Sequence, residues 1–365
     1  MATNPLDLVG GIPLITATGT PRALGEAIGV RCKSRLQVLA QYLKEQLAGA
    51  MTGSGHPITP DELQHHLEAV ALPLSRQEPA LWMEIETMAR VAELPAGDLL
   101  LIHGYGDLLS HYNCPVPPMR SSLLLLSGTN TDTREARLVH AWHLDPALFP
   151  YLTLVRRIPA HGPANITLTL AGLHPVVGLS EAGIAAASNE LRITDGCEGQ
   201  FTPHLLASVF TSPTFEDAAQ RIHKGPRHGG AALHLLSAQG KRLSVELSGQ
   251  EAQDLADPNP KSPRVHTTHP VNVNILRWSA ATGDGTSKGR LAHLASKVIE
   301  ARDLTPAQCA GWFGLGTEDG PNGQRAHLPE GVDPRTTVLT QIDPHTRTLT
   351  FKRGGSPAPV ESIQL

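Results

Sequence analysis

The sequence predicts an α+β domain of layered αββα type, in which helices come first and strands, interrupted by helices, follow. Apolar residues recur at helical spacing up to about residue 104, whereas from Ser121 onward they form short runs bounded by turn residues. The 34 Gly and 30 Pro are scattered at the ends of these segments. Such scatter favours turns and caps in a many-stranded fold over a flexible linker. We therefore expect one structural domain.

Capping residues mark the beginnings of the N-terminal helices. Thr20-Pro21 places a capping hydroxyl before a proline at the first helical position. Thr59-Pro60-Asp61-Glu62 is a capping box that starts a second helix. A third helix is predicted over residues 78–94 and a short fourth over 95–104, since apolar residues continue at helical spacing there.

Strands are predicted where apolar runs are short and bounded by turns. They cover residues 123–126, 138–144, 166–170, 183–187, 231–236, 243–247, 265–268, 337–342 and 346–352. Gln239-Gly240 and Asp343-Pro344 supply hairpin turns. Two helices interrupt the strands, one capped by Thr214 and one over residues 291–301. We expect 123–126 and 138–144 to be adjacent antiparallel strands of a buried sheet.

The composition limits the classes of function. Of 365 residues, 40% are hydrophobic and 18% are charged, and the net charge of -4 provides no basic surface for nucleic acid. No stretch approaches the roughly 20 apolar residues that span a bilayer, and the first residues lack a signal-peptide pattern, so a soluble cytoplasmic protein is expected. The four cysteines are far apart, and no Gly-x-Gly-x-x-Gly or Walker motif implies a nucleotide cofactor.

Five segments of the chain share their order with one known family. They are residues 19–25 (GTPRALG), 84–89 (EIETMA), 178–191 (GLSEAGIAAASNEL), 266–269 (HTTH) and 342–347 (IDPHTR). In this order they resemble the isopenicillin N acyltransferase family of N-terminal-nucleophile (Ntn) hydrolases and its cysteine-peptidase relatives. The resemblance implies a four-layer αββα Ntn sandwich. It also implies self-cleavage into a helical N-terminal segment, 1–120, and an αββα core, 121–365.

The nucleophile position departs from the family pattern. In the family, cleavage before a Cys frees an α-amino group that acts as the base for that side chain. Here the corresponding stretch is Met119-Arg120-Ser121-Ser122, and the Cys position falls on Ser121 or, with a shift of one residue, on Arg120. Ser121 would serve as a nucleophile, whereas Arg120 would leave the site inactive. Cys114 is the nearest thiol, but we interpret it as an ordinary loop residue and not as the nucleophile.

Other residues are assigned to the site through the same resemblance. Asn189 matches the family's catalytic asparagine and would donate to an oxyanion, unless it only caps the end of a strand. His143 stands where the family has an aspartate that holds the nucleophile, and it could replace the hydrogen bond but not the negative charge. Trp142, His103 and His266 are predicted to bind substrate, with residues 103–118 at the mouth of the pocket.

The 18 histidines raise the possibility of a metal site. His140 and His143, and likewise His266 and His269, form His-x-x-His pairs, but residues three apart in a strand point to opposite faces. The acidic residue of the His-Glu-x-x-His motif is also missing. No metal is therefore assigned, and the His65-His66 pair is interpreted as solvated on a polar helix face.

These observations favour an acyltransferase or amidohydrolase that acts on a small-molecule amide or acyl thioester through an Ntn-type mechanism. The substrate would be an acyl-CoA or an acyl amide, with no cofactor, no nucleic acid and no membrane as partners. The sequence also allows a homo-oligomer. The alternative is a family member that does not process itself and binds a small ligand or runs a different reaction. A histidine-based metalloenzyme is the less favoured third hypothesis.

Overall fold

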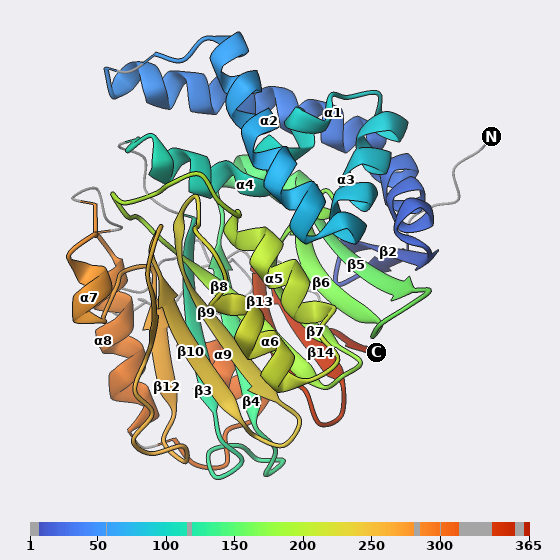
Figure 1. Cartoon of the computed structure of the whole chain (residues 1–365). Coiled ribbons are helices and arrows are strands. Elements are labelled where there is room, and N and C mark those ends of the chain that lie inside the picture. Colours follow the sequence, from blue (N-terminus) through green and yellow to red (C-terminus); the bar gives the residue numbers. More distant parts are fainter. Residues whose placement is uncertain are drawn as a thin grey trace, which may run out of the picture.

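A computed structural model describes residues 7–55, 57–114, 119–280, 285–299, 301–313, 338–354 and 361–365. Two β-sheets stack face to face, and helices cover the outer face of each sheet (Figure 1). The predicted α+β, αββα architecture is therefore confirmed. A group of N-terminal helices lies at one end of the sandwich (Figure 1).

The larger sheet has nine strands in the order β1-β2-β5-β6-β7-β8-β9-β10-β11. Only the β2–β5 pair is parallel among these strands, and the other neighbours are antiparallel. Its strands are β1 (Asp7–Val9), β2 (Ile12–Gly19), β5 (Leu152–Pro159), β6 (Asn165–Leu170), β7 (Leu173–Ser180), β8 (Ile184–Leu191), β9 (Gly230–Ser237), β10 (Arg242–Leu247) and β11 (Ala252–Asp254).

The smaller sheet has six antiparallel strands in the order β12-β3-β4-β13-β14-β15. They are β3 (Arg120–Leu126), β4 (Arg137–His143), β12 (Arg264–Thr267), β13 (Val338–Asp343), β14 (Thr348–Arg353) and β15 (Glu361–Gln364). The expectation that 123–126 and 138–144 pair as antiparallel neighbours is confirmed, since β3 lies against β4 with Ser121 opposite Trp142. Residue 337, the first of one predicted strand, lies outside the described residues.

Two pairs of helices form the outer layers. On the larger sheet, α5 (Thr202–Phe210) and α6 (Phe215–Ile222) pack against β8, β9 and β10 through buried apolar side chains. On the smaller sheet, α8 (Ser287–Val298) and α9 (Pro306–Trp312) cover Leu124, Leu126 and Val139. A short helix, α7 (Val273–Leu276), and a 3-10 turn (Pro146–Tyr151) complete the connections. Thr214 caps α6 as predicted.

The N-terminal helices are α1 (Pro21–Gly53), α2 (Pro60–Gln77), α3 (Pro79–Ala92) and α4 (Ala96–His111). Their predicted beginnings are confirmed, because Thr20 caps α1 and Thr59 forms the capping box of α2 with Glu62. The predicted end of α4 near Gly104 is wrong. Gly104 is a kink with non-helical backbone angles, and the helix continues to His111. A Cβ at this kink would lie 2.3 Å from the Phe201 ring, which explains the glycine.

Several elements escape the sequence pattern. The segment before α1 forms β1 and β2, so the N-terminal segment 1–120 is not only helical and contributes strands to the larger sheet. Strands β5 and β7 and helix α5 were likewise not predicted. Within the described residues, the helices are too short or too polar to cross a membrane.

Candidate active site

The two faces of β3 have different surroundings. Leu123 and Leu125 belong to the core between the two sheets, whereas Leu124 and Leu126 pack against α8 and α9. Because side chains alternate along a strand, Ser121 faces the space between the sheets and Ser122 faces the outer helices. Only 2% of Ser121 is exposed. The residue predicted as nucleophile therefore lies inside the sandwich, one residue from the beginning of its strand.

Asn189 on β8 meets Ser121 across the gap between the sheets. Its Nδ2 donates a hydrogen bond of 2.7 Å to the Ser121 Oγ, and Asn189 is fully buried. Asn189 thus lies in the interior beside residue 121 and not on the outer surface, whereas its role as a donor to an oxyanion stays a prediction. An amide group held this close to a hydroxyl oxygen is placed to donate to negative charge that develops beside it.

Two histidines fix the orientation of the Asn189 amide. The Nε2 of His234 and the Nδ1 of His266 each lie 3.0 Å from the Asn189 Oδ1. Since both rings donate to the amide oxygen, the amide nitrogen is directed toward Ser121. Ser244 Oγ lies 2.9 Å from the other nitrogen of His234 and donates to it. Burial, followed by the neighbouring His266, holds the pKa of His234 well below its usual value, so this ring is neutral.

Glu246 lies behind His266. Its Oε1 is 2.9 Å from the His266 Nε2, and both side chains are fully buried. Its two oxygens also accept hydrogen bonds from the backbone N–H groups of Val271 and Asn272, at 2.7 and 2.8 Å. Both His266 nitrogens therefore face acceptor oxygens. Each side-chain polar atom along the contacts from Ser121 through Asn189 to Glu246 has at least one hydrogen-bond partner, which holds this chain of contacts rigid.

The outer face of the same strand carries a second polar group. Ser122 Oγ lies 3.3 Å from His143 Nε2, and the Arg290 guanidinium donates to Ser122 Oγ and to the Ser121 carbonyl oxygen, both at 2.6 Å. Arg290 also donates to Thr268. His143 thus stands opposite Arg120 in the β3–β4 register but contacts Ser122, on the other face from the Ser121 hydroxyl.

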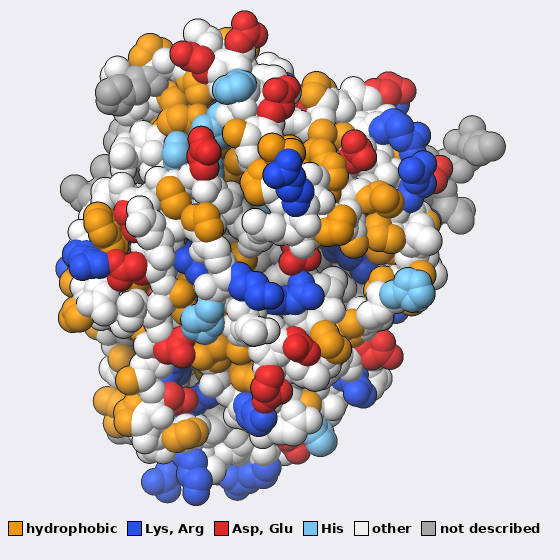
Figure 2. Space-filling view, viewed as in Figure 1, with side chains coloured by type: hydrophobic (Ala, Val, Ile, Leu, Met, Phe, Trp, Pro, Cys, Tyr) orange, Lys and Arg blue, Asp and Glu red, His pale blue; other side chains and the backbone are white. Residues whose placement is uncertain are grey.

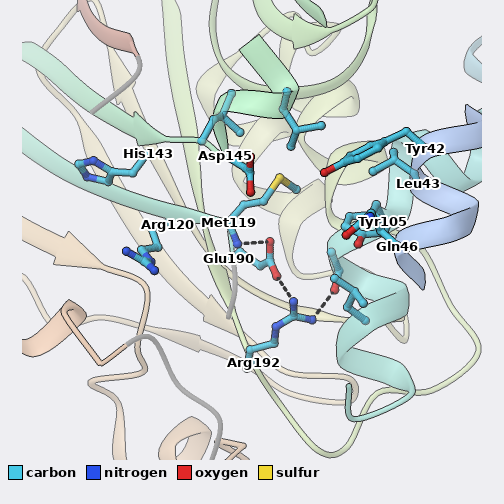
Figure 3. Close-up of a pocket in the computed structure, with 14 residues that line it drawn as sticks. Tyr42, Leu43, Gln46, Tyr105, Met119, Arg120, His143, Asp145, Glu190 and Arg192 are labelled. Carbon is cyan, nitrogen blue, oxygen red and sulfur yellow. Dashed lines mark hydrogen bonds and ion pairs between the residues drawn. The ribbon is translucent and has the colours of Figure 1, made fainter. Parts of the chain in front are cut away.

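A cavity of about 220 Å³ adjoins these residues. Figure 3 shows Met119, Arg120, His143 and Glu190 around it, with Tyr42 and Tyr105 on the helical side. Met119 and Arg120 directly precede Ser121, and Glu190 directly follows Asn189. Residues that line the cavity are therefore the immediate chain neighbours of Ser121 and of Asn189.

Glu190 and Arg192 form an ion pair in the wall of the cavity. The Met119 N–H donates to Glu190 Oε2 at 3.1 Å, and Arg192 forms an ion pair with Glu190 at 3.2 Å and donates to the Gly106 carbonyl (Figure 3). Burial raises the pKa of Glu190, and Arg192 opposes this shift. Burial also raises the pKa of Tyr105. The tyrosine therefore remains a neutral hydrogen-bond donor in the cavity.

The remaining predicted site residues lie elsewhere. Trp142 is opposite Ser121 in the core and 2% exposed. His266 belongs to the buried network described above. His103 lines a different cavity, of about 400 Å³, between the N-terminal helices and the larger sheet. The predicted pocket mouth at 103–118 is helical up to His111, and residues 115–118 lie outside the described residues.

The cysteines and the histidine pairs can also be placed. Cys114 is buried, and burial raises the pKa of its thiol. His140 faces Ser188 between the sheets, on the opposite face of β4 from His143, as the strand periodicity predicted. The interpretation of the His65-His66 pair as solvated is wrong for one member. His65 is exposed, but His66 is half-buried against His111 and His228.

Sequence reasoning missed the residues that support Asn189. His234, Ser244 and Glu246 lie within β9 and β10, in runs that read as ordinary strands. A signal was present, because a histidine among leucines and a glutamate between valine and leucine interrupt otherwise apolar positions. A buried polar residue in such a run needs a partner, but the sequence does not identify that partner.

Solved structures of three amide-bond hydrolases are similar to part of the chain. The C. elegans ortholog of N-acylethanolamine-hydrolyzing acid amidase shares 10% identity over 61% of this chain and 93% of its own, with a TM-score of 0.41. A C2A mutant of conjugated bile acid hydrolase from Clostridium perfringens shares 10% identity over 67% of this chain and 92% of its own, with a TM-score of 0.45. Penicillin V acylase from Agrobacterium tumefaciens shares 13% identity over 67% of this chain and 86% of its own, with a TM-score of 0.37.

No protein-family model and no curated protein sequence matches this chain. The three similar structures have TM-scores below 0.5, so the function rests on this chain's own residues.

Proposed function

We propose that the protein is an Ntn-type amidohydrolase or acyltransferase in which Ser121 is the nucleophile and Asn189 donates to the oxyanion. The observation that carries this proposal is the 2.7 Å contact between Asn189 Nδ2 and Ser121 Oγ, supported from behind by His234 and His266. The five family-like segments in the sequence support the same assignment.

The first reaction is cleavage of the chain itself. Ser121 Oγ attacks the carbonyl carbon of Arg120, the bond to the Ser121 nitrogen breaks, and the nitrogen takes the hydroxyl proton. Water then hydrolyses the resulting ester, which leaves a carboxylate on Arg120 and a free α-amino group on Ser121. The Asn189 amide donates to the oxyanion of the attacked carbonyl in both steps.

Cleavage would also connect Ser121 to the cavity. Met119 and Arg120 line the cavity, and they are the residues that precede the broken bond. Once the bond is cut, this end of the chain is no longer fixed to β3 and exposes the Ser121 hydroxyl. The freed α-amine, with a pKa of roughly 7.7 to 8, is then available as the base that accepts the hydroxyl proton.

In turnover, the Ser121 oxygen attacks the acyl carbon of a substrate and forms an acyl ester. The proton passes through the α-amine to the leaving amine or thiol, and water or an acceptor amine removes the acyl group. A cavity of about 220 Å³ fits a small acyl group. The Glu190–Arg192 pair and Tyr105 on its wall suit a substrate with polar substituents. The substrate class is therefore a small-molecule amide or acyl thioester.

The neighbouring candidates are less suited to the nucleophilic role. Burial raises the pKa of the Cys114 thiol, which disfavours the reactive thiolate. Ser122 faces His143 and Arg290 on the side of the outer helices, away from Asn189. His143 would act there as a positioning residue for the beginning of β3 and not as the base.

The intact mass of the purified protein tests the proposal. Wild type should give two chains, 1–120 and 121–365, and hydrolyse or transfer acyl groups. Ser121→Ala should remain one inactive chain, whereas Ser121→Cys should still be cleaved, because a thiol serves the same role. Ser122→Ala, a change on the opposite face of the strand, is the matched control and should still be cleaved.

Two results would overturn this proposal. A wild-type chain that stays intact while turning over an acyl substrate excludes the Ntn mechanism. An intact chain without turnover favours the alternative of a ligand-binding protein on the same fold.

A further inference from the structure

Three histidines from separate elements converge at the helical end of the molecule. His66 lies on α2, His111 is the last residue of α4, and His228 lies in the segment between α6 and β9. One ring nitrogen from each lies within 4.8 Å of the others. The Nε2 atoms of His66 and His228 are 2.5 Å apart.

The rings are packed tightly together. Their centroids are 4.5 to 4.9 Å apart, and the rings of His111 and His228 are stacked. Gly196 permits this approach, since a Cβ there would lie 2.5 Å from the His228 carbonyl oxygen and 3.5 Å from the His111 Cα. Histidine side chains reach the surface over the N-terminal helices (Figure 2).

The hydrogen-bonding capacity of the three rings is not satisfied by protein groups. Within the described residues, the buried Nδ1 atoms of His111 and His228 have no hydrogen-bond partner, and His228 is fully buried. Buried polar atoms without a partner are costly, so protein groups alone leave this cluster incompletely satisfied. This arrangement differs from the network behind Asn189, where carboxylate, amide and hydroxyl groups occupy every ring nitrogen of the two histidines.

We propose that His66, His111 and His228 bind one divalent transition-metal ion of the zinc type through imidazole nitrogens. Zn²⁺ and the neighbouring transition-metal ions bind neutral imidazole nitrogens well, whereas Mg²⁺ and Ca²⁺ prefer oxygen ligands. With Zn–N bonds of about 2.0–2.1 Å, tetrahedral geometry requires the His66 and His228 nitrogens to separate to roughly 3.3 Å. Rotation of the half-buried His66 ring provides this separation, and water completes the coordination.

Burial keeps the three imidazole rings in the neutral form that binds metal ions. Burial, reinforced by the neighbouring histidines, lowers the pKa of His66 to about 4 and that of His228 to about 2. Burial also lowers the pKa of His111, and the nearby Glu198 carboxylate opposes this shift. The rings are thus neutral near pH 7, with lone pairs free for a cation, and Glu198 adds a negative charge beside it.

The ion would cross-link three elements, namely α2, the C-terminal end of α4 and the segment that leads into β9. Because Tyr105 and Leu109 of α4 line the cavity near Ser121, the cross-link would also fix the position of one wall of that cavity. The metal site does not depend on the reaction proposed for Ser121.

Zn²⁺ binding to the full-length protein, stripped with a chelator and measured by calorimetry, tests the site. Wild type should bind one Zn²⁺, and its melting temperature should rise when Zn²⁺ is added. His66→Ala should weaken this binding at least roughly a hundredfold and abolish the thermal shift. His65→Ala is the matched control, since His65 is the exposed neighbour on the same helix, and it should behave as wild type.

Two further measurements complete the test. His111→Ala, a variant at a partly exposed position, should lose the site in the same way. Bound Co²⁺ should give visible absorption bands in wild type and His65→Ala but not in His66→Ala. Equal Zn²⁺ affinity of wild type and His66→Ala, or no Zn²⁺-dependent thermal shift in wild type, would overturn the proposal.

Discussion

Two groups of histidines, one fully buried and one partly buried, use the same side chain in different ways. Between the sheets, His234 and His266 contact an amide, a hydroxyl and a carboxylate, so each ring nitrogen has a partner that is not a histidine. At the helical end, His66, His111 and His228 contact one another. The first arrangement is complete without any added group and fixes Asn189. The second leaves ring nitrogens for a cation.

Burial alone therefore does not define what a histidine does. Desolvation lowers the pKa of His234 in one group and of His228 in the other. What differs is the partner on the second nitrogen, which decides whether the ring holds a neighbour in place or is available to a ligand.

The largest expected effect comes from removing the carboxylate of the first group. Glu246→Ala leaves the buried His266 Nε2 and two backbone N–H groups without their acceptor. It should therefore lower the free energy of unfolding by several kcal/mol, since each unsatisfied buried donor costs about 1–3 kcal/mol. Urea unfolding measures this loss. His66→Ala in metal-free protein is the comparator and should cost much less, since it removes the partner of a single buried nitrogen, the His228 Nε2. Equal losses would remove the distinction between the two groups.

Next is the donor that the first group holds in place. Asn189→Asp keeps the shape and the acceptor toward His234 and His266 but removes the N–H that faces Ser121. Self-cleavage should slow by about 100-fold to 1000-fold, the range for loss of one oxyanion donor. Mass spectra taken over time after synthesis give the rate. Cleavage at the wild-type rate would mean that the Asn189 amide does not serve the oxyanion.

A smaller effect should appear in the pH dependence of stability. Burial lowers the pKa of His140 to about 4, although its bond to the Ser188 carbonyl opposes the shift. Between pH 6.5 and about 4 the unfolded chain binds a proton that the folded chain does not. Stability due to this residue is therefore present above pH 6.5 and is lost as the pH falls.

The variant His140→Gln keeps a donor for Ser188 but cannot titrate. Its unfolding free energy should fall less steeply in this pH window, by up to about 1.4 kcal/mol per pH unit. Chemical unfolding at a series of pH values gives the two slopes. If the slopes coincide, the neutral buried state assigned to His140 is wrong.

The sequence by itself determined the layers and most elements of this protein. Caps such as Thr20 and Thr59 predicted where helices begin, and short apolar runs predicted β3 and β4 as neighbours, because capping and side-chain alternation are local. It did not predict β2, whose strand conformation depends on pairing with β5, far away along the chain.

For the site, the sequence indicated Ser121 and Asn189 through a resemblance, but only the tertiary structure decided what surrounds them. The contacts of Asn189 with His234 and His266 join residues 45 and 77 positions apart. Likewise, His66 meets His228 from 162 positions away, which no local pattern of apolar spacing encodes. Periodicity shows which face of an element is buried, whereas the packing of whole sheets and helices selects the partner that each buried polar group finds.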